Sequence, residues 1–230
     1  MLVTSVMTLQ TDGVENFESA QVVDTALPDY PVRLAYEGIY SGGARLIVRI
    51  NETGELIDVF VESYTDSEFG RLAERYIERW TFLPAKLNGE PITSIKPIDF
   101  HFDDKRGVYS VGAPEALTAL LYTGNNQDAK RVYSPRELDN ELEPIEMTQP
   151  LYPEDLKRTG IDGSATIMFY VDERGRVRMP HATEYSQNIF GESALHSVTQ
   201  WKFEPPRLKG KPVSVLVKQK FNFKGTSGEG

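Results

Sequence analysis

The sequence predicts an α+β protein with two similar domains in tandem, each a small antiparallel sheet (a β-hairpin plus a last strand) packed against one or two helices. The first observation is a repeat, because residues 80–91 return as residues 201–212. The second is a hairpin pattern in each copy, and the third is a helical pattern followed by an alternating strand. The order helix, strand, strand, helix, strand is typical of an α+β domain.

The repeat sets the domain boundaries. Its period is longer than the 20–50 residues or so of a solenoid unit, which indicates a duplicated domain. We expect five segments: an amino-terminal extension read as a strand (1–19), a first domain (20–104), a linker with a candidate helix at 114–122 (105–133), a second domain (134–224), and a tail expected to be disordered (225–230).

Each copy opens with a Tyr-Pro step, Tyr30-Pro31 or Tyr152-Pro153, which suits the first turn of a short helix. A hairpin follows. Its first strand alternates apolar and polar residues, and its turn starts with Asn51 or Asp172 and ends with glycine three residues later. Asx at the start and glycine at the end of such a turn are a strong short-range hairpin signal.

The second helix of each copy shows apolar residues at three- and four-residue spacing, at 69–80 and 190–201. The last strand is expected at 93–102 and 213–223. We expect the aromatic residues that close each helix and begin the next segment to form the core where helix meets sheet, since large aromatics dominate core energetics. A recognition surface is the alternative. These residues are Trp80, Phe82, Trp201 and Phe203.

Composition restricts the function. The net charge of −9 argues against indiscriminate binding to nucleic acid or anionic membrane. The chain has no cysteine, which removes disulfides and thiolate chemistry. No apolar run approaches the ~20 residues of a membrane helix, and residues 1–10 lack the basic start of a signal peptide. The histidines show no metal-ligand spacing, and no serine lies in a nucleophile elbow. We therefore expect no enzyme, no metal and no cofactor.

Several spaced motifs of the second copy carry a resemblance. They are Tyr152-Pro153, Gly163, the hairpin sequence around Asp172, and the Trp-x-Phe-x-Pro string that starts at Trp201. In this order they resemble the carboxyl-terminal domain of TonB, the energy transducer of Gram-negative envelopes. The match covers residues 134–224 well and residues 20–102 less closely.

The resemblance implies two tandem TonB C-terminal-like domains in the periplasm. It also implies a non-enzymatic module that binds the "TonB box", a short extended peptide of an outer-membrane receptor, in energy-coupled transport. Proteins of this kind carry a membrane anchor and a proline-rich spacer, and neither is visible in this chain.

The last strand of the second copy is the candidate site. At a sheet edge it could accept an added peptide strand through its backbone groups. Pro97 of the first copy stands where the second has Lys218, and proline donates no ladder hydrogen bond, so we expect the second edge to be the receiver. The alternative is that the lysines only prevent aggregation. The expected edge residues are Val213, Val215, Val217, Lys218, Gln219, Lys220 and Phe221.

Two further expectations stay open. Tyr152 and Pro153 are candidate neighbours of the peptide, with packing as the other role. A structural envelope protein that self-associates as a homodimer or binds peptidoglycan is the alternative function, because the end of the second copy is rich in lysine and arginine while the first copy is acidic.

Overall fold

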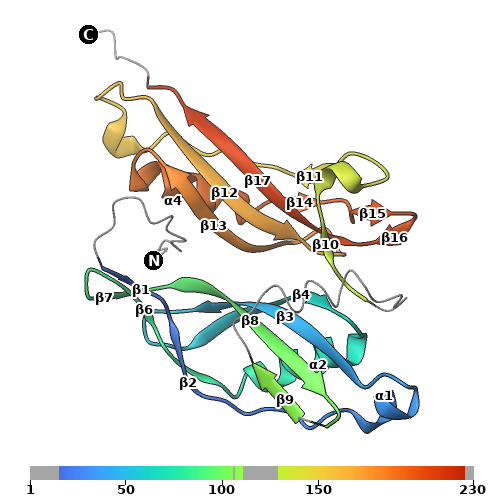
Figure 1. Cartoon of the computed structure of the whole chain (residues 1–230). Coiled ribbons are helices and arrows are strands. Elements are labelled where there is room, and N and C mark those ends of the chain that lie inside the picture. Colours follow the sequence, from blue (N-terminus) through green and yellow to red (C-terminus); the bar gives the residue numbers. More distant parts are fainter. Residues whose placement is uncertain (1–15, 106, 111–128, 226–230) are drawn as a thin grey trace. The chain divides into compact units, whose positions relative to one another are not determined.

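The computed structural model describes residues 16–105, 107–110 and 129–225, and the chain divides into two compact units, one ending at Val132 and one beginning at Tyr133 (Figure 1). Each unit is an antiparallel sheet with a helix against one face, so the predicted α+β fold class is confirmed. The expected strand within residues 1–15 and the candidate helix at 114–122 lie outside the described residues, as do residues 226–230.

The first unit has its main sheet in the order β4-β3-β8-β9, and the helix α2 packs against β3 and β4. Short strands complete it. In chain order the elements are β1 (Phe17–Glu18), β2 (Gln21–Asp24), α1 (Val32–Tyr36), β3 (Ser41–Ile50), β4 (Leu56–Tyr64), α2 (Ser67–Ile77), β5 (Thr81–Leu83), β6 (Ala85–Leu87), β7 (Glu90–Ile92), β8 (Ser94–Asp103) and β9 (Gly107–Ser110).

The second unit repeats this plan with the order β10-β17-β12-β13 and helix α4 on one face. Its elements are β10 (Val132–Tyr133), η1 (Pro135–Glu137), β11 (Pro144–Glu146), η2 (Glu154–Leu156), β12 (Gly163–Val171), β13 (Val177–Tyr185), α4 (Asn188–Val198), β14 (Lys202–Phe203), β15 (Arg207–Leu208), β16 (Lys211–Pro212) and β17 (Ser214–Phe223).

The hairpin turns form as the sequence predicts. In the second unit the Oδ1 of Asp172 accepts hydrogen bonds from the amides of Arg174 and Arg176 at 2.9 and 3.0 Å. Gly175 follows with a φ of +77°, a conformation that glycine adopts without steric cost. Asn51 makes the equivalent pair of bonds in the first unit. The same local chemistry therefore fixes both hairpins.

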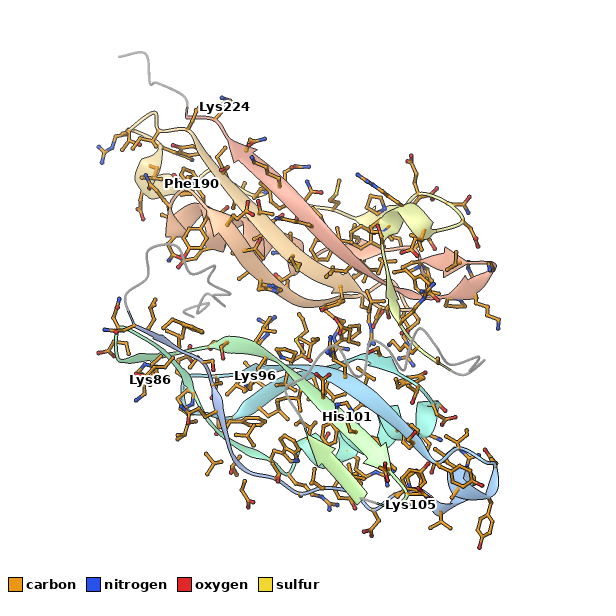
Figure 2. All side chains as sticks on the ribbon, in the orientation of Figure 1. Lys86, Lys96, His101, Lys105, Phe190 and Lys224 are labelled. Atoms are coloured by element: carbon orange, nitrogen blue, oxygen red, sulfur yellow. The ribbon has the colours of Figure 1, made fainter. Side chains whose placement is uncertain are left out.

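The expected aromatic core is present in both copies. Trp80 and Phe82 are buried in the first core cluster, and Trp201 and Phe203 in the second. The indole N–H of Trp201 donates to the carbonyl of Thr148 at 2.8 Å, as a buried indole requires a partner. Phe190, labelled in Figure 2, belongs to the second core cluster and is fully buried. Packing is therefore the role of these residues.

Two details depart from the expected pattern. The helix after Tyr152-Pro153 is a single 3-10 turn, and Gly160 follows it with a φ of +63°, in the left-handed conformation that favours glycine. Small hairpins that were not predicted, β6–β7 and β15–β16, lie between the long helix and the last strand of each unit. Among the described helices, none has the length and apolar character needed to cross a membrane.

Candidate functional site

The candidate site is the outer side of β17, away from β12. β12 and β17 pair without interruption, with Gly163 opposite Phe223 and Val171 opposite Val215. On the other side of β12, β13 is bent by two register shifts, and Met179 has a φ of +49°. Bulges of this kind protect an edge from further pairing. The β17 side of the sheet is therefore the regular one.

The direction of the backbone groups follows from the hydrogen bonds at the two ends of β12. The amide of Ser186 donates to the carbonyl of Ser164, and the amide of Asp172 donates to the carbonyl of Arg176, so even-numbered residues of β12 point toward β13. Odd-numbered residues then point toward β17, because the direction alternates along a strand. Their partners are the odd-numbered residues of β17, which leaves its even-numbered residues pointing outward.

This alternation divides the predicted edge residues. Val215, Val217, Gln219 and Phe221 use their backbone groups on β12 and so cannot also bond an added strand. Lys218 and Lys220 direct their N–H and C=O groups outward. Val213 precedes β17 and donates its amide to the carbonyl of Pro206 at 2.9 Å, so it is not part of the edge strand. The role of the seven predicted edge residues in peptide binding stays a prediction.

Side chains of β17 also alternate. Val215, Phe221 and Phe223 are buried in the core, whereas Lys218 and Lys220 are exposed on the opposite face. The ammonium of Lys218 lies 3.0 Å from a carboxylate oxygen of Glu184. Hydrogen bonding from Lys218 lowers the pKa of the Glu184 carboxyl below its ordinary value, so Glu184 is a carboxylate at neutral pH.

The expected bare edge requires one correction. β17 is not the outermost strand, because β10 lies beside it on the side away from β12. β10 has two residues and β17 has ten. A two-residue strand can meet only two or three positions of its neighbour, so most of the outer side of β17 extends beyond it. Two residues are too few for an alternating pattern, so a strand this short leaves little signal in the sequence.

The equivalent edge of the first unit is arranged differently. Asn51 and Gly43 direct their backbone groups toward β4, which by alternation makes Pro97 point its nitrogen away from β3. Pro97 therefore removes an outward donor without weakening the sheet. Beyond it, β9 pairs with β8 from Phe100 to Asp103. A proline and a covering strand together close this edge.

Tyr152 and Pro153 lie at the start of the second unit's fold. The phenol of Tyr152 donates to the carbonyl of Ile161 at 2.7 Å, and its ring meets Phe190 edge-on at 5.8 Å. Pro153 is buried and precedes η2. Tyr30 of the first unit makes the same bond, to Ile39 at 2.5 Å. These contacts give Tyr152 and Pro153 a packing role, and contact with a peptide stays a prediction.

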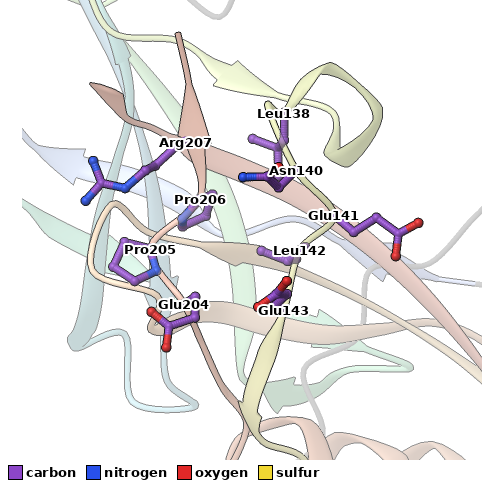
Figure 3. Close-up of a pocket in the computed structure, with 9 residues that line it drawn as sticks. All are labelled: Leu138, Asn140, Glu141, Leu142, Glu143, Glu204, Pro205, Pro206 and Arg207. Atoms are coloured by element: carbon purple, nitrogen blue, oxygen red, sulfur yellow. The ribbon is translucent and has the colours of Figure 1, made fainter. Parts of the chain in front are cut away.

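A hollow of about 280 Å³ lies where the segment leading into the second unit runs beside residues 204–207 (Figure 3). The amide of Glu204 donates to the carbonyl of Glu143, and the amide of Asp139 donates to the carbonyl of Arg207, both at 2.9 Å. Leu138 and Leu142 pack against the core. The hollow therefore lies between two segments that backbone hydrogen bonds hold side by side.

Asp139 fastens this segment to the β15–β16 turn. Its carboxylate accepts the amides of Lys209 and Gly210 at 2.7 and 2.8 Å. The backbone bonds from Gly210 and Lys209 lower the pKa of Asp139, so the anchor is charged at neutral pH. Within the described parts of the chain, no group of three His, Asp or Glu side chains is placed to hold a metal ion.

Comparison with known proteins gives the family. The family model described as Gram-negative bacterial TonB protein C-terminal matches residues 26–103 and again residues 148–224. Protein TonB of Pseudomonas aeruginosa is 28% identical over 87 residues, and Protein TonB of Vibrio cholerae is 30% identical over 77 residues. These matches cover 37% and 33% of this chain. The chain spans 25% and 32% of the length of those two relatives.

Two solved structures resemble part of the chain. The solution NMR structure of the Pseudomonas aeruginosa TonB CTD has a TM-score of 0.33 at 28% identity and covers 37% of this chain and 88% of that one. The structure of the TonB2 protein of Vibrio anguillarum has a TM-score of 0.30 at 23% identity, covering 36% and 81%. With two matched regions that together span more than half of its residues, this chain belongs to the TonB C-terminal family and carries the domain twice.

Proposed function

We propose that the second domain binds an extended peptide by strand addition to the outer side of β17, as part of energy-coupled transport in the periplasm. The ligand is the amino-terminal peptide of an outer-membrane receptor, the TonB box. The observation that carries the proposal is the outward direction of the backbone groups of Lys218 and Lys220. In this role the chain is a binding module without catalysis.

The regular register of β17 supports this proposal. An added strand gains affinity from a row of backbone hydrogen bonds, and selectivity comes from alternate side chains. The exposed face next to Lys218 and Lys220 also carries Glu184, so it offers charges of both signs to a peptide's side chains. The first domain offers no equivalent row, because Pro97 interrupts it and β9 occupies its end.

The substitution Lys218→Pro tests the backbone mechanism. It removes one outward donor, and the ring occupies the space of an incoming strand. We expect binding of a synthetic receptor amino-terminal peptide, measured by calorimetry, to fall tenfold or more, since roughly 1.4 kcal/mol is tenfold. The fold should persist, because Pro97 occupies the equivalent position in a sheet of the same order. Unchanged affinity with an intact fold would contradict strand addition.

The matched control is Lys218→Ala, which keeps the backbone N–H and removes the charge. Strand addition predicts a change of about twofold or less for this variant, since an exposed ion pair contributes little. If purified peptidoglycan is bound instead through the exposed lysines, Lys218→Ala and Lys218→Pro should weaken binding equally. That binding should also vanish at high salt, where exposed charges are screened.

A further inference from the structure

The strand β10 occupies part of the edge to which the peptide would bind. It lies on the outer side of β17, and Tyr133 packs against the core of the second domain. Both residues of β10 are half-buried. Whatever pairs with β17 over the same positions must therefore compete with this segment of the chain.

The length of the chain restricts β10 to the first half of β17. Asp139 is six positions after Tyr133 in the chain, and six steps of extended chain reach at most about 20 Å. Asp139 is held at the β15–β16 turn by Lys209 and Gly210. Asn222 is twelve positions after Gly210, which corresponds to about 40 Å of extended chain. In agreement, η1 contacts β17, and Figure 1 places β10 beside the beginning of this strand.

The outward groups at Lys218, Lys220 and Asn222 therefore lie beyond β10. In the first domain the cover is at the other end, because β9 pairs with Phe100–Asp103, and β9 and β10 both come from the region between the two repeats. That region thus supplies a covering strand to the last strand of each domain. β9 leaves the first half of β8 uncovered, and this half contains Pro97. β10 leaves the second half of β17 uncovered.

We propose that β10 is a displaceable cover of the peptide edge. A short peptide of about five residues binds at Lys218–Asn222 without moving it, whereas a longer peptide must displace β10 from the start of β17. This inference rests on the proposed function of the second domain. A long peptide can bind only those molecules in which β10 has left β17. Its apparent association constant is therefore the intrinsic one multiplied by the fraction of such molecules. It also shields the start of the edge from pairing with other chains.

The double substitution Val132→Gly and Tyr133→Gly tests the cover, because glycine weakens a strand and removes the packing of Tyr133. In the full chain without peptide, we expect at least one of the outward amides in the first half of β17, those of Ser214 and Leu216, to exchange its hydrogen at least tenfold faster than in the wild type. The amides of Lys218 and Lys220 should exchange at unchanged rates. Glu141→Gly, an exposed position in the same lead-in segment, is the control and should change none of them.

Peptide binding gives the second measurement. A ten-residue receptor peptide should bind the double variant several-fold more tightly than the wild type, and a five-residue peptide should bind both equally. Unchanged exchange at both Ser214 and Leu216 would show that β10 is not a cover. Weaker or unchanged binding of the long peptide would show that β10 does not compete for the edge. If neither peptide binds the wild type, the proposed function fails, while the exchange rates still decide whether β10 covers β17.

Discussion

The last strands of the two domains occupy the same place in the same sheet order, and one of the positions at which they differ changes a backbone hydrogen-bond donor. β8 has Pro97 where β17 has Lys218, and each points its backbone nitrogen away from the hairpin. A proline at this position leaves the sheet intact and removes a donor from the outer side. The comparison shows that an edge can lose its ability to pair without any loss to the fold.

The cores, in contrast, are almost the same. The indole of Trp80 donates to Ala26 at 2.9 Å, as Trp201 donates to Thr148. Charge has diverged much further: residues 16–104 hold 16 acidic and 8 basic side chains, whereas residues 133–225 hold 13 of each. Duplication therefore kept the interior and changed the edge and the surface. Three predictions test how far this division holds.

The largest effect is expected from Gly163→Ala and Gly42→Ala. A Cβ at Gly163 would lie 2.1 Å from the ring of Phe190, and one at Gly42 would lie 2.2 Å from the ring of Phe69. Such overpacking costs about 1–3 kcal/mol. We expect each variant to lower the free energy of unfolding of its own domain by about 2–3 kcal/mol, measured by calorimetry, with hydrogen exchange locating the affected domain.

A double variant controls for this interpretation. Gly163→Ala combined with Phe190→Leu should cost less than the sum of the two single changes, because the smaller side chain makes room for the new methyl group. Strictly additive losses would contradict a clash with Phe190. If Gly42→Ala were harmless while Gly163→Ala was not, the two cores would not be equivalent.

A smaller effect is expected at the hairpin turns. Burial alone would raise the pKa of Asp172, but hydrogen bonds from the side chain and amide of Arg176 and from the amide of Arg174 lower it below the ordinary 3.8. Asp172→Asn keeps the turn and loses the ion pair. We expect a loss of about 1 kcal/mol at pH 7 in thermal unfolding, a modest value because Arg176 is half exposed.

The stability difference between wild type and Asp172→Asn should depend on pH in a definite direction. A carboxyl with a lowered pKa in the folded state stabilises the protein fully above its unfolded-state pKa and loses this contribution as the pH falls through the folded-state value. The difference between wild type and Asp172→Asn should therefore begin to shrink as the pH approaches 3.8 and disappear only below the folded-state pKa of Asp172, which is lower than 3.8. The reciprocal Asn51→Asp is the control: it faces Glu55 instead of an arginine, so at pH 7 it should destabilise the first domain. A stabilising Asn51→Asp would contradict the argument.

Sequence patterns predicted most of the fold because local chemistry determines it. The turns at Asn51 and Asp172, the apolar spacing of the two long helices and the period-two last strands all act within a few residues. The small hairpins were missed although Asn88-Gly89 and Lys209-Gly210 have the positive φ angles of a tight hairpin turn, and Asn-Gly is its usual signal. The Asn88-Gly89 sequence is therefore sufficient to predict the first of these small hairpins.

The candidate site was less predictable for a different reason. The difference between Pro97 and Lys218 could be read from the repeat, and it directs attention to the last strand of the second domain as the candidate. The hydrogen bonds of the neighbouring strand β12 determine which residues of β17 point outward, and these bonds cannot be read from the sequence. The covering strand β10 is a second case, because it has only two residues. No periodicity can appear over two residues. Pairing between segments distant in sequence therefore had to come from the structure.

The smallest effect is expected on the exposed face of α1. Val32 and Tyr36 are 63% and 88% exposed, and the second copy has Glu154 and Arg158 at the equivalent positions after its own Tyr-Pro step. The double substitution Val32→Glu and Tyr36→Arg should change the free energy of unfolding by less than about 0.5 kcal/mol, because exposed side chains away from caps and cores contribute little.

Leu34 provides the matched control, since it lies in the same helix and is fully buried. Leu34→Glu places an unpaired carboxylate in the core and should unfold the first domain, because a buried charge without a partner costs several kcal/mol. Calorimetry of the two variants side by side then separates surface from interior within one short helix. A loss above about 1 kcal/mol in the free energy of unfolding for Val32→Glu with Tyr36→Arg would mean that exposed residues of the first copy also stabilise its structure. Divergence after duplication would then have changed more than the edge and a surface without effect on stability.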